Sequence, residues 1–259
     1  MVIAVLVKRV PDTASVFKIA GDNKSVDTAN LKFVMSPYDE YAVEEAIQIK
    51  EAKGDAEVVL VSAGPDAAKD TIRQGLAMGA DRAVLIKEDN LADIGPRGIA
   101  QILAAALKEL NADIVFAGKQ AVDDDASQVP ERVAELLEIP HASVVSKLEV
   151  GDGNATATRE IEGGTMVVEM TLPSLFSIEK GINTPRYPTL PNIMKAKKKE
   201  IKEMSLGDLG LDAGTLKTQV QVEEVSLPRQ DRLNKIIEGD TPERVKQLVS
   251  FLREDEKVL

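Results

Sequence analysis

Three consecutive carboxylates, Asp123, Asp124 and Asp125, form the most unusual cluster of chemically capable side chains in the sequence. They follow an apolar run at 114–117 and precede a helix-like run at 128–137. Carboxylates in this position could bind a divalent cation, bind hydroxyl groups, or cap the following helix, whose dipole favours negative charge at its start. The residues by themselves favour the capping role.

A second candidate is the turn Ser62-Ala63-Gly64-Pro65, which links an apolar run to a helix-like run. Small residues before a helix leave backbone N–H groups free to bind a phosphate or a ribose. Strand-to-helix turns also use glycine and proline for geometry alone, and the turn by itself favours that role. The sequence contains neither a Gly-x-Gly-x-x-Gly fingerprint nor a Walker A loop.

A third candidate combines cations with apolar side chains in a proline-rich segment. The cations are Lys195, Lys197, Lys198 and Lys199. The apolar side chains are Leu190, Ile193 and Met194. A run of lysines is usually a solvated surface. Apolar side chains beside these lysines instead favour a docking surface, in which an apolar anchor binds and a basic rim speeds encounter with acidic partners.

Catalytic groups are scarce. The absence of cysteine excludes disulfides, thiol nucleophiles and cysteine-ligated zinc or iron–sulfur clusters. His141 is the only histidine, so neither a metal site built from several histidines nor a histidine-dependent triad is expected, and we interpret His141 as structural. There is no Gly-x-Ser-x-Gly elbow, and no pair of carboxylates stands out as catalytic. The residues therefore predict a binding fold without catalytic residues or a metal.

The charge and the apolar runs limit the kind of partner. The 259 residues carry a net charge of −11, whereas a nucleic-acid-binding protein needs a basic face. No apolar run approaches the length of a membrane span, and the first residues lack the pattern of a signal peptide. We expect a cytoplasmic protein that binds no nucleic acid and does not insert into a membrane.

Apolar runs alternate with amphipathic runs over the first half of the chain. The apolar runs are typical of strands buried on both faces of a parallel sheet and cover residues 2–7, 58–61, 83–86 and 114–117. The helix-like runs cover residues 40–53, 67–78, 98–110 and 128–137. This alternation predicts an α/β fold with an open, doubly wound, mostly parallel sheet of nucleotide-binding type. Ligands of such sheets bind beyond the carboxyl ends of the strands, here at 8–13, 62–66, 87–90 and 118–128.

The second half of the chain has a different pattern. It predicts an antiparallel meander and a further short strand, at 143–150, 155–161, 166–172 and 174–178. Residues 181–227 appear irregular, and Asp240-Thr241-Pro242-Glu243 opens a terminal helix. We therefore expect an α/β nucleotide-binding domain at 1–180, a recognition loop at 181–200, and an extended arm with a terminal helix at 201–259 that packs on a partner.

Ordered motifs across the chain resemble the electron transfer flavoprotein β subunit. The resemblance runs from residue 2 to about residue 212, and only the last part of the chain is generic. The motifs are Val7-Lys8-Arg9-Val10-Pro11-Asp12, Ala42-Val43-Glu44-Glu45-Ala46, Ala77-Met78-Gly79-Ala80-Asp81, Gly118-Lys119-Gln120, Arg159-Glu160-Ile161-Glu162-Gly163-Gly164, Asn183-x-Pro185-Arg186-Tyr187 and Leu190-Pro191-Asn192-Ile193-Met194-Lys195-Ala196-Lys197-Lys198-Lys199.

The resemblance implies the non-catalytic half of a heterodimeric electron carrier rather than an enzyme. In that family the α subunit binds most of the redox-active FAD, and the β subunit buries an adenine nucleotide where the strand order of its sheet reverses. The implied nucleotide contacts, carried over by position, are Leu6, Ser36, Pro37, Tyr38, Asp39, Ala63, Ala121, Val122, Asp123, Asp124, Asp125, Ala126, Ser127, Gln128, Val129, Pro130, Glu131 and Arg132.

The resemblance also implies roles outside the nucleotide site. Tyr38 would lie near the flavin ring of the α partner, and Glu160 would help to position the mobile flavin domain. Leu190 would insert into an apolar pocket of an acyl-CoA dehydrogenase, with the lysines after it as the basic cluster. Electrons would pass from the dehydrogenase to the FAD of the α subunit and then to a membrane quinone oxidoreductase.

The identity of the nucleotide is the open point of the resemblance. An electron-bifurcating branch of the family holds a second FAD in the β subunit and resembles Asp-Gly-Asp-Thr where this chain has Asp123-Asp124-Asp125-Ala126. Asp124 replaces the glycine that would let the backbone approach a pyrophosphate, and Ala126 removes a hydroxyl donor. We therefore favour AMP. The alternatives are a bifurcating subunit with its own FAD and a stand-alone adenine-nucleotide-binding regulator.

Overall fold

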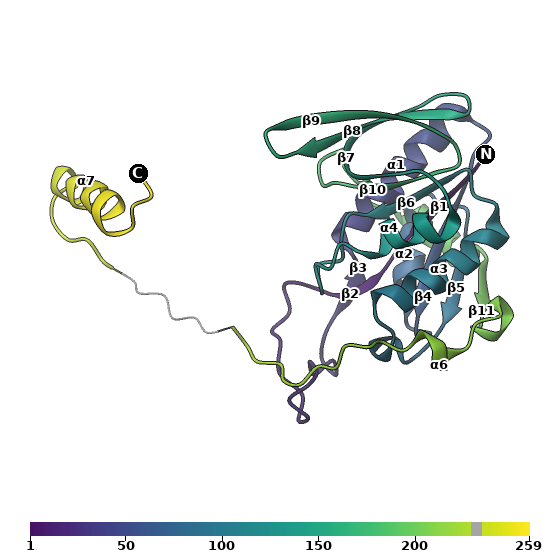
Figure 1. The fold of residues 1–259 in the computed structure, drawn as a ribbon, viewed down its shortest axis with the longest axis horizontal. Helices are drawn as coiled ribbons and strands as arrows, with labels where there is room; N and C mark the ends of the chain where they lie inside the picture. Colours follow the sequence, from purple (N-terminus) through teal and green to yellow (C-terminus); the bar gives the residue numbers. More distant parts are fainter. Residues whose placement is uncertain (229–234) are drawn as a thin grey trace.

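The four apolar runs of the first half form the central parallel strands of a nine-stranded sheet (Figure 1). They are β1 (Val2–Leu6), β4 (Glu57–Gly64), β5 (Arg82–Lys87) and β6 (Ile114–Gly118), and their order in the sheet is β5-β4-β1-β6. The chain returns to the middle after β5, so the strand order reverses between β1 and β6. The computed structural model describes residues 1–228 and 235–259.

Helices cover both faces of these strands, which confirms the predicted doubly wound α/β fold. One face carries α1 (Pro37–Lys53) and α2 (Ala68–Met78). The other carries α3 (Pro96–Leu110) and α4 (Val129–Leu137). Side chains alternate along β1, so Ile3 and Val5 join the first core while Ala4 and Leu6 join the second. Burial on both faces explains why the strands are continuously apolar.

The predicted meander is present at one end of the sheet, as β7 (His141–Val150), β8 (Asn154–Ile161) and β9 (Gly164–Thr171). The short strand β10 (Ser174–Ile178) does not extend the meander. It returns between β6 and β7 and runs parallel to both. All five of its residues are buried, which requires a strand with neighbours on both sides.

The prediction that residues 181–227 are irregular is wrong in places. The segment contains α5 (Leu190–Ala196), β11 (Ile201–Met204) and α6 (Ala213–Leu216). β11 pairs in parallel with β5 and forms the other edge of the sheet, which therefore extends beyond the predicted domain at 1–180. Only Met204 of β11 is buried, so the strand has too few apolar residues to be detected from its pattern.

Several short elements were also absent from the sequence-based prediction. A separate antiparallel pair joins β2 (Arg9–Pro11) to β3 (Phe33–Met35). There are also two 3₁₀ turns in the chain. η1 (Leu91–Asp93) precedes α3, and η2 (Gly207–Leu209) follows β11. These pieces are at most three residues long, too short to show a period.

The terminal helix α7 (Thr241–Ser250) begins as predicted, because the side chain of Asp240 accepts a hydrogen bond from the Glu243 N–H at 3.0 Å. A π-helical turn, η3 (Phe251–Asp255), continues it. Within the described stretch 235–259, α7 buries none of its residues. Residues 229–234 of the predicted arm lie outside the described residues. Among residues 1–228 and 235–259, no helix has the length and apolarity that a membrane crossing requires.

Candidate functional site

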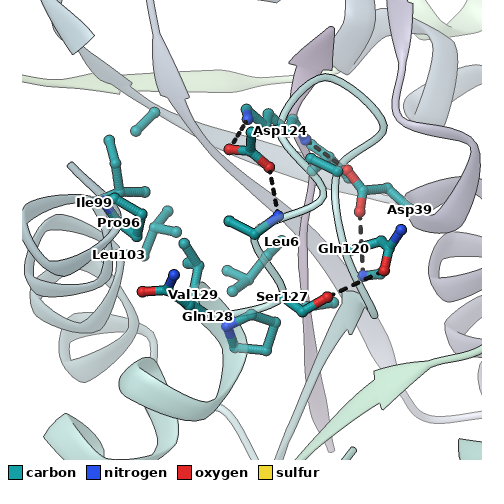
Figure 2. A pocket seen from close by; sticks show the side chains of 18 of the residues that line it. Leu6, Asp39, Pro96, Ile99, Leu103, Gln120, Asp124, Ser127, Gln128 and Val129 are labelled. Atoms are coloured by element: carbon teal, nitrogen blue, oxygen red, sulfur yellow. Dashed lines mark hydrogen bonds and ion pairs between the residues drawn. The ribbon is translucent and has the colours of Figure 1, made fainter. Parts of the chain in front are cut away.

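A cavity of about 240 Å³ lies beyond the carboxyl ends of β1, β4 and β6, at the reversal of strand order (Figure 2). Its walls come from the ends of these strands, the start of α3, and the loop that leads from β6 into α4. This is the position at which open α/β sheets bind ligands. The cavity therefore includes residues of three of the four strand-end segments that the sequence singled out, 8–13, 62–66 and 118–128, and none of segment 87–90.

One wall of the cavity is apolar. Leu6 and Ala63 contribute from the strands, and Ile99, Leu103 and Val129 contribute from the two helices. In Figure 2 the side chains of Ile99, Leu103 and Val129 lie on the helical side of the space. Such a wall suits a flat, weakly polar ring system, because burying apolar surface stabilises it without requiring hydrogen-bond partners.

The opposite wall is a polar loop that is held in an unusual backbone conformation. Asp125 and Ser127 have backbone φ values of 47° and 48°, in the left-handed region that residues other than glycine rarely adopt. Gln120 contacts both: its Nε2 donates to Asp125 Oδ1 at 2.6 Å, and its Oε1 accepts from Ser127 Oγ at 3.1 Å. Strained residues persist where their surroundings over-determine them, and they are common at ligand sites.

Asp39 joins two of the strand ends beneath the cavity. Its carboxylate accepts hydrogen bonds from the Lys8 N–H at 2.7 Å and from the Gly118 N–H at 3.1 Å. Burial raises the pKa of Asp39 to about 7, against the opposing effect of these two hydrogen bonds. Gly118 allows the approach, because a Cβ there would lie 2.5 Å from Asp39 Oδ1.

The three aspartates do not cap α4, so that prediction is wrong. The cap residue is Gln128, and its side chain makes no capping hydrogen bond with the backbone of the first turn. Lys8 Nζ instead forms ion pairs with Asp123 at 2.8 Å and with Asp124 at 3.1 Å. Burial alone would lower the pKa of Lys8, but the two carboxylates outweigh it and raise that pKa above its usual value. The described part of the chain holds no group of three or more His, Cys, Asp or Glu side chains arranged for a metal ion.

The predicted nucleotide contacts divide into two groups. Those that line the cavity are Leu6, Asp39, Ala63, Ala121, Asp124, Ala126, Ser127, Gln128, Val129 and Pro130. Those that do not line it are Ser36, Pro37, Tyr38, Val122, Asp123, Asp125, Glu131 and Arg132. Pro37, Tyr38 and Val122 line a second groove of about 590 Å³ that also includes Arg186 and Tyr187.

The remaining predicted contacts have other partners or positions. Glu131 accepts a hydrogen bond from Ser143 Oγ at 2.7 Å, and Arg132 donates to Gln128 at 3.0 Å. Ser36 is fully buried, and its hydroxyl has no hydrogen-bond partner within the described residues. Glu131 and Arg132 are close to the loop in the sequence, yet neither lines the cavity.

Sequence reasoning missed the contribution of α3 to the cavity. Pro96, Ile99 and Leu103 line the cavity, although no residue of this helix was assigned to a ligand site from the sequence. Ile94, just before the helix, also lines it. A sequence signal for this role is weak, since a stripe that faces a ligand and a stripe that faces a core have the same period.

The predicted docking residues lie on α5 and just after it. Leu190, Met194 and Ile193 are 74%, 58% and 42% exposed, and Lys195, Lys197 and Lys198 are exposed beside them. We call these six residues the docking surface. Lys199 is different, because its Nζ is turned inward and donates to the backbone carbonyls of Leu76 and Ala80.

Other singled-out residues lie elsewhere on the molecule. Glu160 is exposed near the end of β8. Tyr38 is half-buried at the start of α1, with Lys119 Nζ 5.7 Å from its ring centre. His141 is exposed at the first residue of β7 and is not among the cavity-lining residues.

Comparison with known proteins identifies the family. A family model described as an electron transfer flavoprotein domain matches residues 24–209. The chain is also 40% identical over 256 residues to the electron transfer flavoprotein subunit beta of Bacillus subtilis (strain 168), a match that covers 98% of each chain. The chain belongs to the electron transfer flavoprotein β subunit family. The resemblance inferred from the ordered motifs is thereby confirmed.

Further members of the family come from distant organisms. The electron transfer flavoprotein subunit beta of Bradyrhizobium diazoefficiens is 44% identical over 212 residues, which are 82% of this chain and 84% of the relative. The mitochondrial electron transfer flavoprotein subunit beta of Arabidopsis thaliana is 42% identical over 230 residues, covering 88% and 90%. The match to the family model includes α5 and the loop from β6 to α4.

Proposed function

We propose that this chain is the β half of a heterodimeric electron carrier, in which it holds AMP and receives acyl-CoA dehydrogenases while an α subunit binds most of the FAD. Electrons would pass from the dehydrogenase through the FAD to a membrane quinone oxidoreductase. The observation that carries the proposal is the membership in the electron transfer flavoprotein β subunit family, together with a small cavity and an exposed apolar helix.

The lining of the cavity suits AMP. The apolar wall of Leu6, Ile99 and Leu103 would receive the adenine ring. The start of α4 at Val129 and the preceding loop would offer free N–H groups to the phosphate. The hydroxyl of Ser127 and the amide of Gln128 would bind ribose oxygens or the phosphate.

The lining of the cavity favours a mononucleotide over a second FAD. The cavity, at about 240 Å³, is small against the ~300–1,000 Å³ typical of small-molecule and cofactor pockets. Asp124, which stands where the bifurcating branch has glycine, faces the cavity and is engaged by Lys8 Nζ at 3.1 Å. A pyrophosphate there would have to compete with this ion pair and approach a carboxylate.

Nucleotide identity can be tested on the purified heterodimer. Acid extraction followed by chromatography should release one AMP and one FAD per heterodimer. Release of two FAD and no AMP would overturn the AMP assignment and favour the bifurcating alternative. In that case reduction of the complex by NADH provides an independent check.

The docking surface is the second part of the proposal. Leu190 is the most exposed of its apolar members, and large side chains that enter a partner pocket contribute most of the binding energy. Truncation of Leu190 to alanine should weaken docking by about 2 kcal/mol, or about 30-fold in KM for the carrier. Flavin content should stay unchanged, and an unchanged KM with an acyl-CoA dehydrogenase as electron donor would contradict the docking role.

The α subunit is the proposed partner of the remaining exposed apolar residues. Val220, Val222 and Leu227 on the arm are all more than half exposed, as is Val245 on α7. A partner that covers these side chains would explain their exposure. Tyr38 would lie near the flavin of that subunit, and Glu160 would position its flavin domain. If affinity purification of the tagged chain recovers no flavin-containing protein, the stand-alone nucleotide-binding regulator becomes the better interpretation.

A further inference from the structure

Polar contacts hold both ends of the segment that carries the docking surface. Before α5 in the chain, Arg186 contacts two glutamates of α1. At the C-terminal end of α5, Arg73 of α2 contacts the Ala196 carbonyl. We call these groups the Arg186 clamp and the Arg73 clamp.

The Arg186 clamp is built around a buried carboxylate. The Glu44 side chain is only 4% exposed and accepts from Arg186 Nε at 2.8 Å and Nη2 at 3.0 Å. Glu51 accepts from Nη1 at 2.6 Å and Nη2 at 3.0 Å on the solvent side. The hydrogen bonds that Arg186 donates to Glu51 and Glu44 raise the pKa of Arg186 above its usual value. Two bidentate pairs on one guanidinium fix its position in all directions within its plane.

A neighbouring amide strengthens this attachment. Asn183 Nδ2 donates to Glu45 Oε2 at 2.9 Å and to the Tyr41 carbonyl at 3.1 Å. The residues of the chain immediately before α5 are therefore attached to three successive turns of α1.

The Arg73 clamp is reciprocal. Arg73 Nη1 donates to the carbonyls of Ala196 at 2.5 Å and Lys199 at 2.6 Å, at the end of α5. Lys199 Nζ donates in return to the carbonyls of Leu76 and Ala80, at the end of α2. Each cation thus binds backbone carbonyls at or just beyond the end of the other helix, where positive charge is favoured.

The clamps matter because α5 has little else to hold it. A helix of seven residues is too short to be stable alone in water, and Ala196 is its only buried residue. Its large apolar side chains, Leu190, Ile193 and Met194, are 42% to 74% exposed and contribute little core packing. We propose that Arg186, Glu44, Arg73 and Lys199 are positioning residues that keep α5 helical and oriented before a dehydrogenase binds. The proposal rests on the docking function, and it means that the entropy of ordering α5 is not lost again on binding.

The test compares variants in the full heterodimer. Arg186→Gln and Arg73→Gln should each raise KM for the carrier about fivefold to tenfold at unchanged kcat, with an acyl-CoA dehydrogenase and its acyl-CoA as electron source. They should also speed hydrogen exchange of the α5 amides about tenfold or more. Unchanged KM and unchanged exchange in folded variants would overturn the proposal.

A matched pair of glutamates keeps the test independent of gross unfolding. Glu51→Gln removes only the exposed half of the Arg186 clamp and should give a smaller rise, about twofold to threefold, in both measurements. Glu57→Gln removes a similar ion pair with Arg82, which does not contact residues 183–199, and should change neither. If Arg186→Gln fails to assemble, the difference between Glu51→Gln and Glu57→Gln decides the question, and equal behaviour of the two would overturn it.

Leu190→Ala separates this proposal from the docking function. It should raise KM while leaving hydrogen exchange of α5 unchanged. If Leu190→Ala leaves KM unchanged, the docking function fails, and the exchange measurement still decides whether the clamps order α5. If Leu190→Ala raises KM but the clamp variants do not, only the positioning role fails.

Discussion

The proposed nucleotide cavity and the docking surface differ in which side chains are buried and which are exposed. In the cavity, apolar residues such as Leu103 are buried, and the charged groups Asp39 and Lys8 are engaged by hydrogen bonds or ion pairs. Around α5, the charges of Arg186 and Arg73 turn toward the protein while Leu190 and Met194 face solvent. The cavity is formed by this chain alone, whereas the docking surface, in the proposed function, would be completed only by another protein.

This difference has an energetic meaning. Residues of the cavity would contribute both to folding and to the proposed nucleotide binding, because the strand ends that line the cavity also form the centre of the sheet. Exposed residues of α5 contribute almost nothing to folding. Substitutions in the two regions should therefore separate stability from docking.

The largest expected effect is on the cavity. In Gly118→Val, the added Cβ would lie 2.5 Å from Asp39 Oδ1 and 2.8 Å from the Tyr38 backbone carbon, so it would force the end of β6 away from the start of α1. We expect the free energy of unfolding to fall by about 3 kcal/mol and bound adenylate to be lost. Urea unfolding and nucleotide extraction measure the two effects. Gly21→Val is the control, because a Cβ added at Gly21 would meet no atom within 4 Å. It should leave the free energy of unfolding almost unchanged.

The next effect is a dependence of stability on pH. The pKa of Asp39 is about 7 in the folded protein and about 3.9 in the unfolded chain, so the folded state holds an extra proton between these values. Its contribution to stability is fully present below about pH 4 and is lost as the pH rises to about 7, with a slope of at most about 1.4 kcal/mol per pH unit. Urea unfolding at several pH values across this range should show that the free energy of unfolding falls less with rising pH in Asp39→Asn than in the wild-type protein. Parallel curves for the two proteins would refute the assignment.

A smaller effect is expected from the lysines of the docking surface. The double substitution Lys197→Gln and Lys198→Gln should slow association with the dehydrogenase about threefold and weaken its dependence on ionic strength, since these exposed charges act on encounter. Stopped-flow measurements at several salt concentrations test this. Lys147→Gln on β7 is the control. An association rate of the wild-type protein that does not change with salt would exclude the basic rim.

The smallest effect sharpens the comparison most directly. Leu190→Ala should change the free energy of unfolding by less than about 0.5 kcal/mol, because its side chain is 74% exposed. Leu103→Ala, a truncation of the same kind in the cavity wall, should cost about 3 kcal/mol. Equal losses in the two variants would show that α5 is part of the folding core and not a surface reserved for a partner.

Long, buried elements were predicted from the sequence, and short or half-exposed ones were not. The runs that became β1 and β6 and the stripe of α3 contain enough apolar residues to display a period. β11 and α5 are four and seven residues long and bury little, so their patterns resemble those of a loop. The candidate site divides in the same way. Asp124 and Ser127 were predicted because they lie in the segment that directly follows a buried strand. Ile99 and Pro96 line the cavity from α3, whose apolar pattern is the same as that of a helix facing only the core.

What the sequence by itself determined was the class of fold, the edge of the sheet at which a cavity lies, and, through its ordered motifs, the family. These features depend on local composition and on the order of elements along the chain, and both can be determined from the linear sequence. Tertiary structure alone decided that Lys8 pairs with Asp123 and Asp124, that Lys199 belongs to α2 and not to the docking surface, and that Arg186 is held by Glu44. Each of these contacts joins residues more than 100 positions apart, and a charged side chain does not reveal in the sequence which distant partner will reduce the cost of its burial.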